Sequence, residues 1–128
     1  TGDHRCTFRC ADFFNLALTS DGFSPHGKQQ YDAILLDIDH SPTHRLTDQL
    51  VAERKLEQTD FYHAENLCKL ANHLKPGGLF AMWSNDPPDE VFLASLGKAF
   101  SKVEAEICEF PNPYSDEKSA NTIYLARR

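Results

Sequence analysis

The sequence predicts an α/β fold, and two features of it lead to that prediction. Short apolar strands alternate with amphipathic helical stretches, which is the order expected of parallel strands joined by helical crossovers. The strand at Ala33–Leu36 is apolar on both of its faces, as is typical of a strand that is covered on both sides. We therefore expect a mostly parallel sheet with helices packed against it.

The first third of the chain predicts two strands separated by a helix and a loop. A short strand is expected at Thr7–Cys10 and a brief helix at Ala11–Leu18. Ser20–Gln30 contains two glycines and a proline, so we expect a loop there. The clearest strand is Tyr31–Asp39. It ends in acidic residues, which places carboxylates where open α/β sheets bind their ligands.

The middle of the chain predicts one well-defined helix. Thr43–Thr59 is polar and is either a surface helix or a mobile lid. Asp60–Leu74 is expected to be helical because it carries an apolar stripe at the helical period, formed by Phe61, Ala64, Leu67, Cys68, Ala71 and Leu74. Lys75–Gly78, with the sequence Lys-Pro-Gly-Gly, is expected to end this helix.

A second buried strand and a second helix follow. The strand is expected at Leu79–Ser84. Asp86 is expected to cap a helix that begins at Pro87 and Pro88, because proline is tolerated in the first helical turn. The apolar face of this helix is formed by Phe92, Leu93, Leu96, Ala99 and Phe100.

The chain is expected to close with two antiparallel strands. Val103–Phe110 alternates apolar and polar residues, which indicates a half-exposed strand. A long polar connection, Pro111–Ala120, leads to the final strand at Asn121–Ala126. No helix fits between these strands, so they should pair antiparallel.

Composition and charge exclude several classes of protein. The net charge is −6, and the 13 Lys and Arg residues are scattered, which argues against a nucleic-acid partner. No apolar stretch is long enough for a membrane span, and Thr1–Cys10 lacks the apolar run of a leader. Of the four cysteines, Cys6 and Cys10 would lie about 13 Å apart on a strand, too far for a disulfide. We therefore expect reduced thiols and a cytoplasmic protein.

Four segments together resemble the spermidine synthase family of the Rossmann-like, S-adenosylmethionine-dependent methyltransferase superfamily. They are Ala11–Phe14 (ADFF), Tyr31–Asp37 (YDAILLD), Asp60–Tyr62 (DFY) and Leu74–Gly78 (LKPGG). The resemblance covers nearly the whole chain and implies a methyltransferase-type sheet, mostly parallel with a C-terminal antiparallel strand. The chain contains no G-x-G turn, so the first strand–helix units of such a fold are missing. Residues 1–128 are therefore expected to form a single, partial domain, either a fragment or a reduced fold.

The resemblance also implies roles for particular residues. Asp12 would accept a hydrogen bond from the adenine of the cofactor, with the backbone of Phe13 beside the ring. Asp37 would be the catalytic carboxylate that holds the attacking amine and takes its proton. Substrate would be bound by three further side chains, Asp39, His40 and Tyr62. The implied donor is decarboxylated S-adenosylmethionine or S-adenosylmethionine, the acceptor is a small amine, and the implied assembly is a homodimer.

Other interpretations of the same residues stay open. Asp37 and Asp39 are also typical of turns at strand ends, and Asp12 is also a plausible helix cap. Tyr62 would also serve in helix packing. His40 and His44 have i, i+4 spacing, but Pro42 between them excludes the helix on which that spacing binds zinc, so we expect no metal.

Three functions are therefore carried forward. The first is a spermidine synthase-like transfer of an aminopropyl group to an amine. The second is a methyltransferase with another acceptor. The third is a non-catalytic half-domain used for dimerisation or protein binding.

Overall fold

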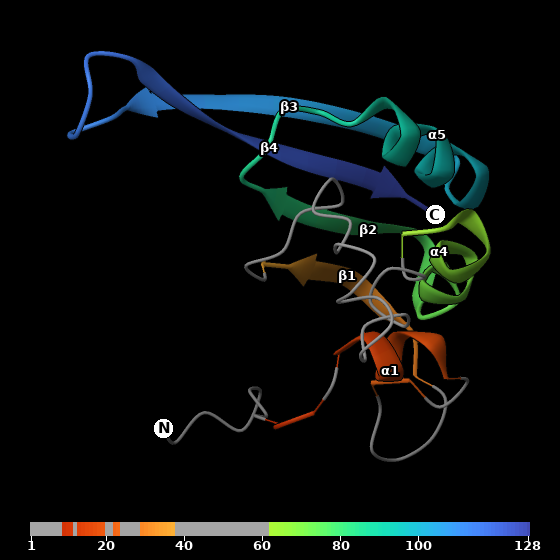
Figure 1. The fold of residues 1–128 in the computed structure, drawn as a ribbon. Helices are drawn as coiled ribbons and strands as arrows, with labels where there is room; N and C mark the ends of the chain where they lie inside the picture. The colour runs from red at the N-terminus through yellow and green to blue at the C-terminus, as the bar shows by residue number, and fades with distance from the viewer. Residues whose placement is uncertain (1–8, 12, 20–21, 24–28, 38–61) are drawn as a thin grey trace, which may run out of the picture.

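The computed structural model describes residues 9–11, 13–19, 22–23, 29–37 and 62–128 of the chain (Figure 1). These residues form a four-stranded mixed sheet in the order β1-β2-β4-β3, together with three helices. The elements are α1 (Phe13–Leu18), β1 (Tyr31–Leu36), α4 (Ala64–Ala71), β2 (Leu74–Ser84), α5 (Glu90–Ala99), β3 (Lys102–Pro111) and β4 (Lys118–Arg127). The α/β class predicted from the sequence is confirmed.

Three strands of the sheet run in one direction and the last strand runs in the other. β1 pairs parallel with β2, whereas β4 pairs antiparallel with both β2 and β3. The expected antiparallel C-terminal strand and the antiparallel pairing of the last two strands are therefore confirmed. Because β4 lies between β2 and β3, two of the three described pairings are antiparallel, and the sheet is more mixed than the sequence indicated.

The hydrophobic core lies on one face of the sheet. Alternate residues of neighbouring strands point toward it, and α4 and α5 pack against them at the same side of the sheet (Figure 1). The strand residues buried here are Ile34, Leu36, Phe80, Met82, Tyr124 and Ala126, and the helix residues include Leu67, Leu70, Phe92 and Leu96. Leu67, Phe92 and Leu96 belong to the apolar stripes predicted for the two helices. Leu70 was not part of the predicted stripe, and Cys68, which was, is exposed.

The opposite face of the sheet is apolar but less buried. Leu35 is 74% exposed, and Ala81, Trp83 and Ile123 are half-buried. The prediction that Ala33–Leu36 is covered on both faces is wrong for the described residues. β1 is an edge strand there, and α4 and α5 cover only the face that carries Ile34 and Leu36.

The boundary between α4 and β2 differs from the prediction. The helix ends at Ala71, and Leu74 already belongs to β2. The backbone N–H of Tyr31 donates to the carbonyl of His73 at 2.8 Å, so pairing with β1 begins immediately after the helix. The Lys-Pro-Gly-Gly segment is therefore an irregular start of β2 with Gly77 at φ +80°, and the register shifts between Tyr31 and Ala33.

Helix α5 is capped by Asp89, and the predicted Asp86 cap is wrong. The Asp89 carboxylate accepts a hydrogen bond from the backbone N–H of Val91 at 3.1 Å. Asp86 instead belongs to the connection after β2. Its carbonyl accepts a 2.7 Å hydrogen bond from the Thr122 hydroxyl, and its N–H donates to Ser84 Oγ at 3.2 Å.

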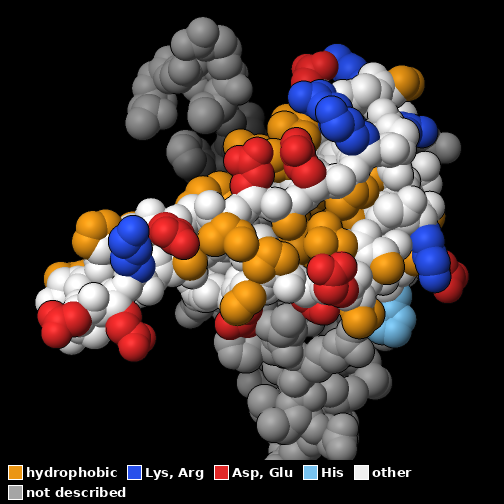
Figure 2. Space-filling view, turned by 90° about the horizontal axis from the view of Figure 1, so that it is seen from above, with side chains coloured by type: hydrophobic (Ala, Val, Ile, Leu, Met, Phe, Trp, Pro, Cys, Tyr) orange, Lys and Arg blue, Asp and Glu red, His pale blue; other side chains and the backbone are white. Residues whose placement is uncertain are grey.

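The β3–β4 hairpin is longer than the sequence predicted. Its ladder continues to the pair Pro111–Lys118, so the polar connection shrinks to residues 112–117. β2 last pairs with β4 at Thr122, and the hairpin projects beyond the rest of the sheet (Figure 1). Figure 2, seen from the β3–β4 side, shows this projection with acidic side chains near its end and hydrophobic side chains gathered toward the body of the molecule.

The amino-terminal prediction is only partly within the described residues. Arg9 and Cys10 lie in no strand, and the rest of the predicted strand at Thr7–Cys10 lies outside the described residues. Cys10, Cys68 and Cys108 are free thiols. Among the described helices, none has the length and apolar character that crossing a membrane requires.

Candidate functional site

Asp37 lies at the carboxyl end of β1, where the sequence analysis placed its candidate carboxylate. It directly follows Leu36, the last residue of the strand, and it is exposed. Leu36 pairs with Met82 of β2, so the parallel register brings Trp83 next to position 37. The ends of two adjacent parallel strands therefore place a carboxylate and an indole ring at the same edge of the sheet.

A hollow of about 230 Å³ is lined by both of these residues. Its lining consists of Leu35, Leu36, Asp37, Ala81, Met82, Trp83 and Ile123. Among the described residues of this lining, Asp37 is the only ionisable one, and the others are apolar or aromatic. Such a wall with one carboxylate suits a small ligand that carries a positive charge on an aliphatic chain.

The orientation of Trp83 is set by β4. Trp83 pairs with Ile123 across the β2–β4 ladder. With the side-chain amide of Asn121 turned so that its oxygen faces the ring, Trp83 Nε1–H donates to Asn121 at 3.3 Å. The polar edge of the indole thus has a partner, and the half-buried Trp83 contributes to the lining of the hollow.

The other residues predicted for the site do not gather around this hollow in the described part of the chain. Asp12, Asp39 and His40 lie outside the described residues. Phe13 is half-buried in α1, and its ring stacks on Phe23 with centroids 5.2 Å apart. Its role beside the adenine stays a prediction.

Tyr62 is part of the hydrophobic packing before α4. Its ring meets Phe92 of α5 edge-on, with centroids 5.5 Å apart. Burial raises the pKa of its hydroxyl well above the usual range. Tyr62 is not among the residues that line the hollow at Asp37. The structure thus shows the packing role that the sequence left open, and its substrate role stays a prediction.

Trp83 is the site residue that sequence reasoning missed. Its strand was predicted to be buried, and an aromatic residue in a buried strand is usually part of the core. The signal was nevertheless present, because side chains alternate between the two faces of a strand. Met82 is on the core face, so Trp83 must be on the opposite face. Because Leu36 of β1 pairs with Met82, Trp83 lies beside Asp37.

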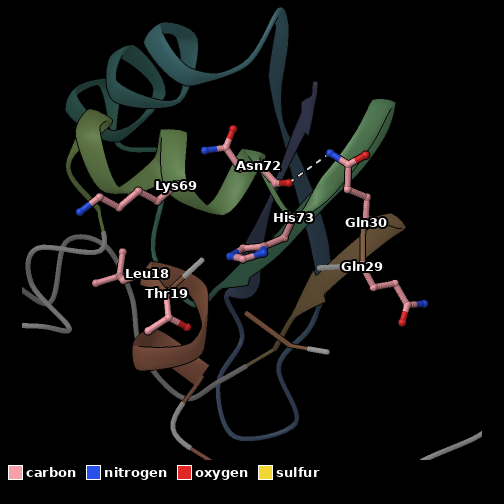
Figure 3. A pocket seen from close by; sticks show the side chains of 7 residues that line it. All are labelled: Leu18, Thr19, Gln29, Gln30, Lys69, Asn72 and His73. Atoms are coloured by element: carbon pink, nitrogen blue, oxygen red, sulfur yellow. Dashed lines mark hydrogen bonds between the residues drawn. The ribbon is translucent and has the colours of Figure 1, made fainter. Parts of the chain in front are cut away.

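A second and larger cavity, of about 640 Å³, lies at the amino end of β1 (Figure 3). It is lined by Leu18, Thr19, Gln29, Gln30, Lys69, Asn72 and His73. His73 Nε2 is 3.0 Å from the carbonyl of Ala17, and Gln30 Nε2 donates to the carbonyl of Asn72 at 3.3 Å. These bonds join α1, the end of α4 and the start of β1. The six residues of β1 separate this cavity from Asp37 by about 20 Å.

The described residues contain no group of three or more His, Cys, Asp or Glu side chains that is arranged to hold a metal ion. His40 and His44, the pair weighed as metal ligands in the sequence, lie outside the described residues.

Comparison with known proteins identifies structural likenesses to several solved chains. The solved structure of a probable spermidine synthase from Corynebacterium glutamicum ATCC 13032 superposes with a TM-score of 0.57 and 23% sequence identity. The match covers 93% of this chain and 37% of that chain, so this chain spans little more than a third of the other's length. The likeness shows the fold. No protein-family model matches this chain, and no curated protein matches it in sequence. The α/β sheet of this protein thus resembles part of a spermidine synthase.

Proposed function

We propose that this chain forms the acceptor-binding part of a spermidine synthase-like transferase, which moves an aminopropyl group from decarboxylated S-adenosylmethionine to a small amine. The observation that carries the proposal is the position of Asp37. This residue stands at the carboxyl end of a parallel strand and lines an apolar hollow. The likeness to part of a probable spermidine synthase supports the same function.

Aminopropyl transfer requires the protein mainly to align the amine with the sulfonium-bound carbon and to remove one proton from the amine. The lone pair of the amine attacks the carbon bound to the cationic sulfur. The carbon–sulfur bond breaks, and its electron pair leaves with the sulfur as a neutral thioether. Asp37 would first hold the ammonium form of the acceptor and then accept the proton that the nitrogen loses. Positioning of the two reactants would supply most of the rate.

The experiment is an assay of the protein with decarboxylated S-adenosylmethionine and putrescine, in which methylthioadenosine is measured by mass spectrometry. We expect Asp37→Asn to abolish its formation. The matched control is Asp32→Asn, because Asp32 is an exposed carboxylate on the same strand, 3.3 Å from Lys75. Turnover retained in Asp37→Asn would remove the catalytic assignment. With S-adenosylmethionine as donor, release of S-adenosylhomocysteine would instead identify methyl transfer, the second enzyme function.

A second candidate is a non-catalytic module that forms a homodimer, and it is favoured by the exposed edge of the sheet. In the described part of the chain β1 pairs only with β2, and its Leu35 is 74% exposed. An apolar edge strand of this kind is prone to pair with another chain. The oligomeric state, measured by sedimentation, tests this second candidate. A dimer that becomes monomeric in Leu35→Glu supports it, and a monomeric unaltered protein excludes it.

A further inference from the structure

Trp83 and Asp37 line the same hollow, but the proposed reaction gives a role to Asp37 alone. The catalytic scheme needs a carboxylate, but a carboxylate alone on an exposed rim holds an amine weakly, because water competes for both charges. Here Trp83 also lines the hollow, and none of the described residues in this lining is positively charged. A cation that enters the hollow would therefore meet an aromatic surface and a negative charge at once.

The ring is held in place by groups on β4. With the Asn121 amide turned so that its oxygen faces the ring, the hydrogen bond from Trp83 Nε1–H restricts the indole, so less side-chain freedom is lost when a ligand binds. Leu35, on the neighbouring strand, continues the apolar wall toward Asp37. Indole is the strongest aromatic partner for cations, and its attraction extends to about 6 Å from the ring centroid.

We propose that Trp83 is the residue that recognises the cationic group of the ligand, by a cation–π contact beside Asp37. The ligand class is an alkyl cation, meaning an aliphatic ammonium or sulfonium whose carbon chain packs against the apolar wall. This inference rests on the proposed function for its biological setting. Binding, however, is a property of the hollow itself and is measurable without catalysis.

The protein offers a direct reporter, because Trp83 is its only tryptophan. Tryptophan fluorescence is followed while putrescine is added at fixed ionic strength and neutral pH, where both amines are charged. Butane-1,4-diol, which has the same chain length but no charge, is the matched probe. We expect putrescine to change the emission in a saturable manner, and the diol to leave it unchanged at the same concentrations. An equal response to both probes, or no response to putrescine, overturns the inference.

Variants then separate the aromatic contribution from the charge. Binding of putrescine to Trp83→Leu and Trp83→Phe is measured by calorimetry, because both variants lose the fluorophore. We expect about two- to thirty-fold weaker binding in Trp83→Leu, and a smaller loss in Trp83→Phe, which keeps an aromatic face. Asp37→Asn should also weaken binding, and Asp32→Asn should not. Thermal unfolding of each variant shows that the sheet is intact. Unchanged binding in a folded Trp83→Leu overturns the proposed role.

This inference and the proposed function can fail separately. Charge-selective putrescine binding that depends on Trp83, without any methylthioadenosine formed, supports the cation site and removes the transferase. Transfer that persists with an unaltered Michaelis constant for putrescine in Trp83→Leu supports the transferase and overturns the role of Trp83.

Discussion

The hydroxyl of Tyr124 accepts a hydrogen bond from the backbone N–H of Asp89 at 2.9 Å. Tyr124 is in the middle of β4 and is fully buried, whereas Asp89 is the N-cap of α5. The Tyr124 ring also meets Phe92 edge-on, with centroids 4.8 Å apart. The Tyr124 side chain thus holds the start of α5 against the core face of β4. The opposite face of β4 carries Ile123, which lines the hollow at Asp37.

Replacement of Tyr124 by Phe should remove this hydrogen bond while keeping the ring in the core. The Asp89 N–H would be left without the hydroxyl, so we expect the free energy of unfolding to fall by about 1–2 kcal/mol. Urea denaturation measures the change. The control is Tyr114→Phe, because Tyr114 is 96% exposed and its hydroxyl contributes nothing to the core. Equal stability of the two variants would contradict the structural role of the Tyr124 hydroxyl.

Two tyrosines with buried hydroxyls, Tyr62 and Tyr124, predict a loss of stability at alkaline pH. Burial raises the pKa of both Tyr62 and Tyr124, and for Tyr124 the nearby carboxylates of Asp89 and Asp86 raise it further, against the lowering effect of the Asp89 N–H. In the unfolded chain a tyrosine ionises near its ordinary pKa of about 10. Above that pH the unfolded state loses protons that the folded state retains, so unfolding becomes easier as the pH rises.

We therefore expect the urea midpoint to be insensitive to these groups below about pH 9 and to fall between about pH 10 and 11. Tyr62→Phe should make this decline shallower, because one of the two raised groups is removed. Tyr114→Phe should leave the decline unchanged. A midpoint that falls equally steeply in Tyr62→Phe and the unaltered protein would show that Tyr62 does not contribute.

The sequence predicted the elements better than it predicted their contacts. Apolar periodicity is a local property, so it located helix α5, whose buried residues Phe92 and Leu96 belong to the predicted stripe. Strand pairing is not local. Leu74 looked like the end of a helix, but its pairing with Tyr31 makes it the first residue of β2. Asp86 was predicted to cap the helix because two prolines follow it, although Asp89 provides the cap.

The candidate site shows the same division. Asp37 could be predicted because a carboxylate that follows an apolar strand is visible in the sequence alone. Trp83 could not be assigned in this way, because its significance depends on which strand lies next to β2 and in which register. The pairing of Leu36 with Met82 supplies that information. The exposed face around Leu35 could not be predicted either, because a local pattern does not reveal that the described helices pack only against the opposite face of the sheet.

The packing of α5 predicts a sharp contrast between its two faces. Leu96 is fully buried in the core, whereas Val91, near the start of the same helix, is 59% exposed. Leu96→Ala would leave a cavity, so we expect the free energy of unfolding to fall by about 2–5 kcal/mol. Val91→Ala should change it by less than about 0.5 kcal/mol, because no buried contact is lost. Urea denaturation of both variants checks this, and similar losses would contradict the assigned orientation of α5.

Two glycines predict opposite effects of the same substitution. Gly22 is buried at φ +56°, and a methyl group on its Cα would overlap Cε1 and Nδ1 of the His73 ring. His73 cannot easily move away, because its Nε2 is bonded to the Ala17 carbonyl and Phe23 packs edge-on against its ring. Gly22→Ala therefore combines backbone strain of about 1–2 kcal/mol with a steric clash, and it should destabilise the protein by more than either alone.

Gly97 is the matched control, because it lies within α5 and a methyl group on its Cα would meet no atom within 4 Å. Gly97→Ala should raise the free energy of unfolding by about 0.5–1 kcal/mol, since alanine loses less backbone freedom in a helix. Thermal and urea unfolding of the two variants show directly whether each substitution raises or lowers the free energy of unfolding. If Gly22→Ala were as stable as Gly97→Ala, the close contact between residue 22 and His73, which joins the α1 region to the start of β2, would be absent in solution.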